Sequence, residues 1–311
     1  MTAVASRLPV GLLIMRTSLT KTELGNALLF ETLNALYDVL GRLDCEVIVV
    51  GATARDIAFM LLNEESSKRK TFDLDIAVAL SDWNKFDRLT EALCENCFEK
   101  LQPKQKFSYR GPDNNNDYEV DIVPFGEISD NTNETIPWPP DGTPEMSVRC
   151  YKDIMAHAIE ISIEDIHIKI APLAGQFIIK LDAWVDRNDR FDKDASDMMF
   201  ILSRYFTAMA TEYTEAWPDE VDFENMDDTC IIPAAEWIAS DSSKMLSTDH
   251  LRYYRDLLIK ECSLAEKSRL MRQLTKDDDD NPDLWKNVSK ALVRMSEIWD
   301  AEIKRREIRC I

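Results

Sequence analysis

The chain has 311 residues, of which 45% are hydrophobic and 30% charged, and its formal net charge is −20 at pH 7. This composition is ordinary for a globular protein and supplies enough apolar material for two domains or one large one. The negative charge argues against a broad electrostatic grip on duplex nucleic acid, which requires many exposed Lys and Arg side chains.

The N-terminal region gives no indication of export. Its longest apolar run, residues 9–15, lies between Arg7 and Arg16. That run is too short to span a bilayer and lacks a cleavage site of small residues. The seven cysteines are scattered and odd in number, which fits a reducing compartment better than a disulfide framework. We therefore expect a cytoplasmic protein without a signal peptide and without membrane contact.

The first elements predicted along the chain are a helix, a strand and a second helix. Residues 18–42 have apolar side chains at helical spacing, with Ser18 and Thr20 as candidate caps and Gly41 near the end, and they predict one amphipathic helix. Residues 47–50 are apolar and mostly β-branched and predict a buried strand that stops at Gly51. After a tight turn, a helix is expected over residues 54–63.

The next stretch, KTFDLDIAVAL, places Asp73 and Asp75 inside an apolar run. Because successive side chains of a strand point to opposite faces, the two carboxylates share one face, and Leu74 and Ile76 share the other. Two carboxylates this close repel each other unless a cation lies between them. The alternative is that the acid pair protects an edge strand from pairing with other chains.

The middle of the chain predicts further strands. Ser81 is a candidate cap for a helix that runs to about Glu95. Residues 118–124 alternate as a strand that carries Asp121 on its acidic face. Residues 125–147 predict a loop, which is either a surface excursion or a flap over a site. Residues 161–172 alternate as one more strand.

The second half of the chain predicts helices. Residues 173–186 have helical spacing, and the helical pattern after residue 196 is interrupted near Pro218, Pro233 and the acid run 277–280. We interpret the acid run as a solvated turn with a helix cap. The predicted fold class is α+β, with a mixed-sheet domain over residues 1–171 and an all-helical domain over residues 172–311.

Three features combine into one hypothesis about chemistry. A strand that ends in a glycine turn and opens a helix presents backbone N–H groups and a positive helix dipole, which suit phosphates. Asp73 and Asp75 on one strand and Asp121 on another supply three carboxylates. This set suits two divalent ions that bridge a nucleoside triphosphate and support displacement at phosphorus.

Four segments carry a resemblance to a known family. They are Gly51-Ala52-Thr53-Ala54-Arg55-Asp56, Thr71-Phe72-Asp73-Leu74-Asp75-Ile76-Ala77-Val78, Val120-Asp121-Ile122-Val123-Pro124-Phe125-Gly126, and Lys180-Leu181-Asp182-Ala183-Trp184-Val185-Asp186-Arg187 with Lys193-Asp194-Ala195 and Asp197 after it. In these segments the chain resembles the nucleotidyltransferase superfamily related to DNA polymerase β. It resembles more narrowly the predicted bacterial nucleotidyltransferases akin to AbiEii-type toxins. The resemblance covers about half of the chain.

The resemblance implies a metal-dependent enzyme that moves a nucleoside monophosphate from a nucleoside triphosphate to an acceptor hydroxyl. Asp73, Asp75 and Asp121 would be catalytic and would hold Mg²⁺ or Mn²⁺. Gly51, Ala52, Thr53 and Arg55 would bind the nucleotide. The acceptor would be an RNA end, such as that of tRNA, or a protein, in a toxin or phage-defence setting with a cognate antitoxin as a possible partner.

The fourth segment supplies basic groups. Lys180, Ala183, Trp184 and Arg187 line one face of a helix. Lys180 is predicted to be catalytic, offsetting charge on the leaving side, and Arg187 to bind the nucleotide. The alternative is that Lys180 and Arg187 pair with nearby acids such as Asp194 or Asp197 and serve the structure alone.

Other functions stay open from the sequence. The acceptor could be a small molecule, as for an antibiotic-type nucleotidyltransferase, because residues 111–200 are the most acidic part of the chain. The protein could also bind a nucleotide without turnover, as an interaction protein. The basic residues 68–70 could contact a nucleic acid or form a solvated loop.

Overall fold

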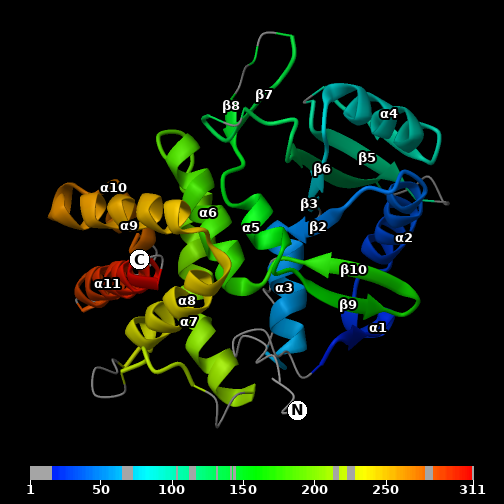
Figure 1. Cartoon of the computed structure of the whole chain (residues 1–311). Coiled ribbons are helices and arrows are strands. Elements are labelled where there is room, and N and C mark those ends of the chain that lie inside the picture. Colours follow the sequence, from blue (N-terminus) through cyan, green and yellow to red (C-terminus); the bar gives the residue numbers. More distant parts are fainter. Residues whose placement is uncertain are drawn as a thin grey trace, which may run out of the picture. The chain divides into compact units, whose positions relative to one another are not determined.

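The computed structural model describes residues 16–64, 73–102, 104–111, 117–130, 132–140, 142, 145–212, 217–222, 228–276 and 283–309. Two compact units divide at Pro172, namely Arg16–Pro172 and Leu173–Ile311 (Figure 1). The basic residues 68–70 and the acid run 277–280 lie outside the described residues, so the interpretations of both stay predictions.

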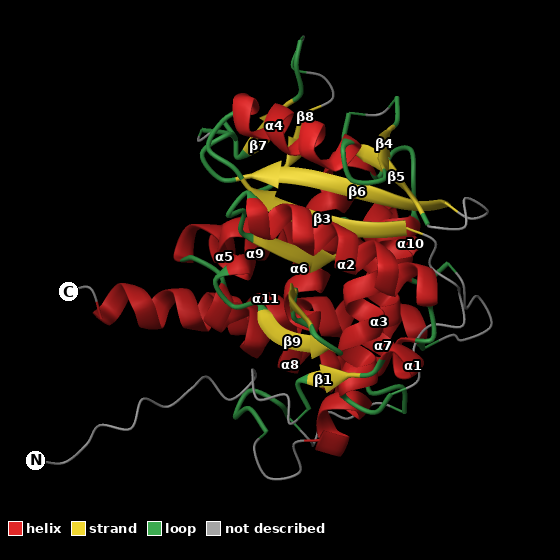
Figure 2. Ribbon diagram, turned by 90° about the vertical axis from the view of Figure 1, so that its right-hand side faces the viewer, coloured by secondary structure: helices red, strands yellow, loops and turns green. Residues whose placement is uncertain are grey.

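The described part of the first unit contains a mixed sheet of eight strands, in the order β1-β9-β10-β2-β3-β6-β5-β4 (Figure 2). Its strands are β1 (Ser18–Leu19), β2 (Val47–Val50), β3 (Asp73–Ala79), β4 (Phe98–Lys100), β5 (Lys106–Arg110), β6 (Asp117–Phe125), β9 (Ile159–Ile163) and β10 (Ile166–Ile170). The pairs β1/β9, β2/β10 and β3/β6 are parallel and the others antiparallel. The predicted mixed sheet is thereby confirmed.

The described part of the first unit also contains five helices, three of which contact the sheet. They are α1 (Lys21–Leu24), α2 (Ala27–Arg42), α3 (Gly51–Leu61), α4 (Trp83–Cys94) and α5 (Tyr151–Met155). Helix α2 contacts β6 and β10, α3 contacts β2 and β3, and α4 contacts β4 and α2. The apolar side chains of β3 and β6, such as Leu74 and Ile122, are fully buried in this packing.

The single helix predicted over residues 18–42 is wrong. Ser18 lies in β1 and caps nothing, whereas Thr20 does cap α1 in a reciprocal arrangement with Glu23. Gly25 then ends α1 with φ of 66°, in the left-handed region that glycine adopts without steric cost. Asn26 starts α2 by accepting a hydrogen bond from the N–H of Leu29. The helical spacing of apolar residues continues through this break. The sequence signal against a single helix was Gly25 followed by the capping residue Asn26.

Two further predictions in this unit need correction. Helix α4 is capped by Asp82, whose carboxylate accepts from the N–H of Lys85, and Ser81 only donates to Asp82. The helix expected from residue 54 begins at Gly51, so the presumed turn is the first turn of α3.

The segments predicted as a loop and as one strand contain additional pairing. Residues 125–147 include a two-stranded hairpin of β7 (Thr135–Pro137) and β8 (Glu145–Ser147). Trp138 follows β7, is 2% exposed and packs on Trp83 at a ring-centroid distance of 5.3 Å. Residues 159–170 form two antiparallel strands, β9 and β10, joined through Glu164 with φ of 51°.

Strand β3, which carries Asp73 and Asp75, lies between β2 and β6 inside the sheet. The hypothesis that this acid pair protects an edge strand is therefore wrong. Two charges on an interior strand need another explanation, either a solvated sheet face or a cationic partner.

The second unit is helical throughout its described residues. Its helices are α6 (Leu173–Arg187), α7 (Lys193–Glu212), α8 (Ile231–Met245), α9 (Thr248–Ser263), a 3-10 helix (Ala265–Lys267), α10 (Arg269–Leu274) and α11 (Leu284–Arg309). Helix α11 packs against α8 and α9, and Trp299 of α11 donates from Nε1 to Ser242 Oγ at 3.0 Å. Pro233 does not interrupt a helix but lies in the first turn of α8, where a missing N–H costs little. The α+β class with a helical C-terminal region is as predicted.

Candidate functional site

The three predicted carboxylates come together on one face of β3 and β6. The two strands are parallel, and their register places Asp75 opposite Asp121 and Asp73 opposite Glu119. Asp73, Asp75 and Asp121 are partly exposed, whereas Leu74 and Ile76 are fully buried. The predicted alternation of acidic and apolar side chains is confirmed, and the sheet adds a fourth carboxylate, Glu119.

A lysine that the sequence analysis did not single out lies among these acids. Lys106 of β5 is paired in register with Asp121. Its Nζ lies 3.3 Å from Asp121 Oδ1 and also contacts Glu119 Oε1. One ammonium therefore bridges two of the four carboxylates on this face.

Asp121 has an unusual environment for a carboxylate. Burial raises its pKa, the ammonium of Lys106 opposes that rise, and the nearby charges of Glu119 and Asp73 add to it. Its Oδ1 atom is buried, and the Lys106 ammonium lies beside it at 3.3 Å. A buried carboxylate oxygen of this kind needs a cation or a proton as its partner.

The start of α3 lies directly against these acids. Val50 caps α3 without a side-chain hydrogen bond, and Gly51 follows with φ of 68°. A Cβ atom on Gly51 would lie 2.0 Å from Oδ2 of Asp75. Glycine is thus required here for two reasons, the left-handed backbone and the close approach of the carboxylate. The first turn of α3, which includes Ala52, brings its N–H groups to the same edge.

Two residues that were predicted to bind the nucleotide, Thr53 and Arg55, are buried and make hydrogen bonds within the protein. Thr53 is 3% exposed, and its hydroxyl donates to the backbone oxygen of Asp73 at 3.1 Å, which ties α3 to β3. Arg55 is 6% exposed and donates from Nε to Asp56 at 2.9 Å. Thr53 thus joins the start of α3 to β3, whereas the contact of Arg55 with Asp56 lies within α3.

Tyr118 of β6 is a second residue that the sequence analysis missed. Burial raises its pKa to about 12, its hydrogen bond with Thr53 lowers it, and the charges of Asp73 and Asp75 raise it further. The phenol stays protonated and supports Thr53 from within the core. Because its neighbours come from α3 and β3, no local pattern in the sequence identifies it.

The donor set was tested for a divalent cation. Asp73, Asp75 and Asp121 offer only oxygen atoms, which are the ligands that Mg²⁺ and Mn²⁺ prefer. Within the described residues, no three or more His, Cys, Asp and Glu side chains are grouped as a metal site. In this arrangement the cation beside Asp121 is the ammonium of Lys106. The three carboxylates match a hard divalent ion in donor type and share one sheet face, but in this arrangement they are not drawn together as a metal site.

The two other predicted site residues, Lys180 and Arg187, belong to α6 in the helical unit. Nζ of Lys180 lies 2.7 Å from Asp197 Oδ2 and 3.6 Å from Asp194 Oδ1. Arg187 binds both carboxylate oxygens of Asp194, at 2.6 and 2.7 Å. Asp194 is 1% exposed, so this cluster is a buried ion-pair network. The pairing named as the structural alternative for Lys180 and Arg187 is present.

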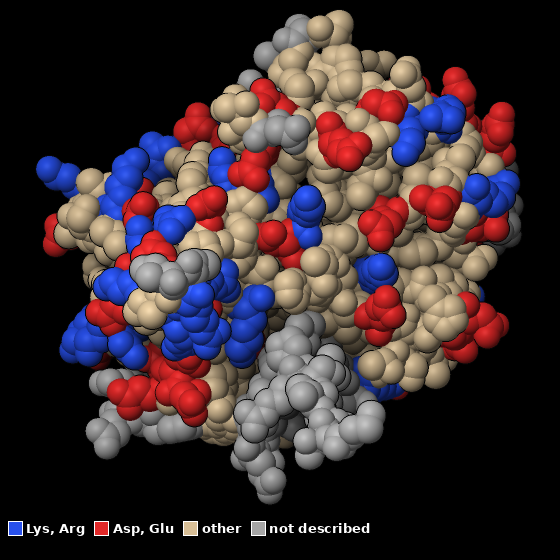
Figure 3. Space-filling view, in the orientation of Figure 1, with Lys and Arg blue, Asp and Glu red and all other residues tan. Residues whose placement is uncertain are grey.

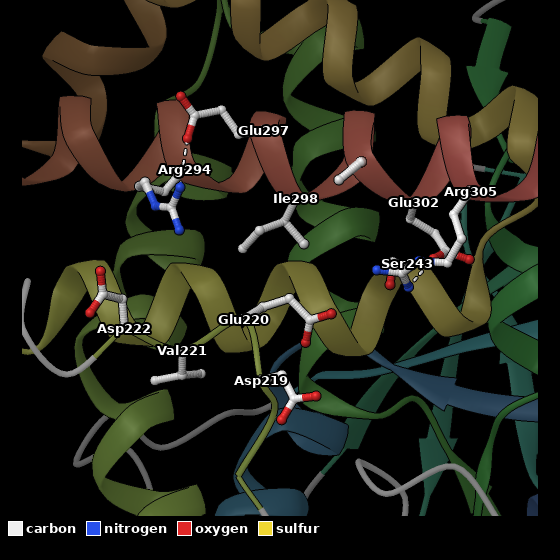
Figure 4. Close-up of a pocket in the computed structure, with 11 residues that line it drawn as sticks. Asp219, Glu220, Val221, Asp222, Ser243, Arg294, Glu297, Ile298, Glu302 and Arg305 are labelled. Atoms are coloured by element: carbon white, nitrogen blue, oxygen red, sulfur yellow. Dashed lines mark hydrogen bonds and ion pairs between the residues drawn. The ribbon is translucent and has the colours of Figure 1, made fainter.

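The helical unit has a hollow of its own, formed by α8, α11 and residues 219–222 (Figure 4). Its volume is about 720 Å³. Five carboxylates and two guanidinium groups line it, namely Asp219, Glu220, Asp222, Glu297, Glu302, Arg294 and Arg305. Arg294 donates to Glu297 at 2.7 Å, and Arg305 to Glu302 at the same distance. Each arginine of the hollow pairs with one of its carboxylates, but the five carboxylates outnumber the two arginines, so the hollow is acidic on balance. The sequence pattern did not single it out.

Basic side chains gather over the surface that α9 and α11 form, with acidic side chains among them (Figure 3). Arg252 contacts Asp249 and Glu307, and Arg255 contacts Asp300. This basic surface is therefore internally neutralised to a large extent. It gives no indication of the continuous positive stripe that duplex nucleic acid requires.

Comparison with known proteins adds little to this geometry. No protein-family model matches the chain, and no curated protein matches it. Among solved structures, the crystal structure of JHP933 from Helicobacter pylori aligns with 14% sequence identity and a TM-score of 0.35. The alignment covers 94% of this chain and 97% of that one. None of the helices in the described part of the chain has the length and apolar character needed to cross a membrane.

Proposed function

We propose that this protein is a metal-dependent nucleotidyltransferase, which moves a nucleoside monophosphate from a nucleoside triphosphate to the hydroxyl of an RNA or protein acceptor. One observation carries the proposal. Asp75 and Asp121 face each other on adjacent parallel strands, Asp73 lies on the same face, and Asp75 abuts Gly51 at the start of α3. Carboxylates beside the positive end of a helix are the combination that a metal-bound triphosphate needs.

Asp73, Asp75 and Asp121 would hold Mg²⁺ or Mn²⁺, which when bound would neutralise phosphate charge and lower the pKa of the attacking hydroxyl. In the reaction, the acceptor oxygen forms a bond to the α-phosphorus, and the bond from that phosphorus to the bridging oxygen breaks. Pyrophosphate leaves with the electron pair of the broken bond. The acceptor loses one proton in this exchange.

Asp121 is suited to receive that proton. Its place opposite Asp75 on the acidic face would let its carboxylate accept or pass on the proton of the acceptor hydroxyl. The N–H groups of the first turn of α3 would orient the triphosphate. Thr53 would hold that turn in place through the contact with β3 described above.

The toxin or phage-defence setting is part of the proposal and rests on the resemblance of the four segments alone. The same applies to a cognate antitoxin as a partner. Lys180 and Arg187 enter the proposal as groups that would offset charge on the leaving side. To contact the nucleotide, these two side chains would have to leave their ion pairs with Asp197 and Asp194 or contact both partners at once.

The proposal is tested by thermal unfolding of the protein with Mg²⁺ and each nucleoside triphosphate, combined with measurement of pyrophosphate release on addition of cellular RNA or protein. At a ligand concentration 100 times the dissociation constant, binding stabilises the fold by about 2.7 kcal/mol. We expect metal-dependent stabilisation in the wild type and its loss in Asp73→Ala and Asp75→Ala. Stabilisation that is the same in all three proteins would remove these acids from the site. Binding without pyrophosphate release from any acceptor fraction would favour the interaction protein over the enzyme.

A further inference from the structure

Lys106 lies beside Asp121, one of the three carboxylates that the proposed function assigns to a metal ion. Its ammonium is held between Asp121 and Glu119, and 27% of its side chain is exposed. The lysine comes from β5, which pairs with β6 on the side away from β3. The acidic face of β3 and β6 thus has a cation supplied by the protein itself.

Carboxylates outnumber the lysine on this face. Asp73, Asp75, Asp121 and Glu119 are four carboxylates within two paired strands, and Lys106 contributes one positive charge. The ammonium lies 3.3 Å from Asp121 Oδ1 and also contacts Glu119. The lysine therefore offsets part of the repulsion between the carboxylates and supplies a cationic partner for the buried oxygen of Asp121.

We propose that Lys106 is a tethered competitor of the divalent cation, which holds Asp121 while no metal is bound and must withdraw before Asp121 becomes a metal ligand. The inference rests on the proposed function, because it assumes that the three acids bind a metal. Its consequence is that metal affinity at Asp121 is kept low in the absence of substrate. Withdrawal of Lys106 is feasible because its aliphatic stem is flexible and reaches solvent.

A purely structural lysine predicts the opposite result. If Lys106 only joined β5 to β6, its removal would loosen Asp121 and weaken metal binding or leave it unchanged. A competitor, once removed, leaves the carboxylates with more negative charge and no occupant, so metal binding tightens. The sign of the change in metal affinity separates the two roles.

The experiment measures Mn²⁺ binding without nucleotide, by the electron paramagnetic resonance signal of free Mn²⁺, on the full-length protein. We expect Lys106→Met to bind Mn²⁺ about tenfold more tightly than the wild type, the size of effect that one unit charge exerts at a partly exposed site. Lys106→Arg keeps the positive charge and should bind like the wild type. Lys104→Met removes a charge from the turn before β5 and is the matched control, with expected wild-type affinity. Lys106→Gln serves as the second neutral variant if the methionine variant does not fold by circular dichroism.

The outcomes distinguish this inference from the proposed function. Mn²⁺ binding that is lost in Asp75→Asn and unchanged or weaker in the neutral Lys106 variants overturns the competitor role and leaves the metal site standing. Binding seen only in the neutral Lys106 variants supports the competitor role in its strongest form. Binding in none of the proteins, or binding unaffected by Asp75→Asn, overturns both.

Discussion

Replacing Gly51 by alanine should destabilise the first unit and displace Asp75. The new Cβ atom would lie 2.0 Å from Oδ2 of Asp75 and 2.8 Å from its Cγ. The backbone at Gly51 also has a φ of 68°, where an alanine is strained. Either the carboxylate or the start of α3 must move to make room.

The magnitude follows from these two costs. The left-handed conformation costs an alanine about 1–2 kcal/mol, and forcing a methyl group into filled space costs about 1–3 kcal/mol. The reduced freedom of the unfolded chain returns about 0.4–1 kcal/mol. The expected net loss in the free energy of unfolding is therefore about 1–5 kcal/mol.

Gly41→Ala is the matched control, because a Cβ at Gly41 meets nothing within 4 Å and the residue lies in α2. It should be neutral or stabilising by up to about 1 kcal/mol. The assay is urea unfolding of both variants, with Mn²⁺ binding measured in parallel. Equal unfolding free energies for the two variants, or full Mn²⁺ binding by Gly51→Ala, would refute the reasoning about the close contact with Asp75.

Three other changes have defined expectations. Lys180→Met should lower nucleotidyl transfer about a hundredfold. Asp197→Asn weakens the same ion pair but keeps the ammonium of Lys180, so it should lower transfer far less. Equal losses in the two variants would mean that the ion pair is purely structural. Trp138→Ala should lower the free energy of unfolding in urea by about 3–5 kcal/mol, because the indole is 2% exposed and packs against two aromatic side chains of α4. A loss below about 1 kcal/mol would contradict this expectation. Burial raises the pKa of Asp241 above the ordinary carboxyl value, so the folded protein holds this proton at a pH where the unfolded chain has released it. That stabilising contribution is present at low pH and is lost as the pH rises above the ordinary carboxyl pKa and through the raised one, so Asp241→Asn should gain stability relative to the wild type as the pH rises over that range. A difference that does not vary with pH would contradict the shift.

The alternation of acidic and apolar residues was enough to place Asp73 and Asp75 on one face of their strand and Asp121 on the acidic face of its own, because side-chain direction in a strand depends only on local geometry. The structure adds that β3 and β6 are neighbours in a register that brings the three acids onto one shared face. The glycine at residue 51 was also recognisable, since the strand that precedes it ends abruptly. What the sequence did not indicate is how closely Asp75 approaches it.

Lys106 and Tyr118 could not be predicted in the same way. Their roles depend on which strand pairs with β6 and in which register, and the loop lengths before and after β5 do not determine that register. Lys106 begins a short alternating segment in which Phe107 and Tyr109 are buried. That pattern identifies a strand, but the partner of its lysine is set by tertiary structure.

The helix boundaries show that the spacing of apolar residues alone does not locate the ends of helices. The apolar spacing of residues 18–42 runs through Gly25, although the chain there forms a helix end and a new cap at Asn26. A short helix such as α1 has too few turns to show a pattern of its own. In this case the capping residues were more informative than the hydrophobic spacing.

The most direct test of the proposed nucleotidyl transfer measures label that passes from α-labelled nucleoside triphosphates, with Mg²⁺ or Mn²⁺, to total cellular RNA and to total cellular protein. The wild type is compared with Asp75→Asn and with Asp117→Asn, a control on the exposed start of β6. We predict that the wild type transfers label to one of the two fractions, that Asp75→Asn does not, and that Asp117→Asn still does. Absence of label with every triphosphate, or transfer that survives Asp75→Asn, would contradict this prediction.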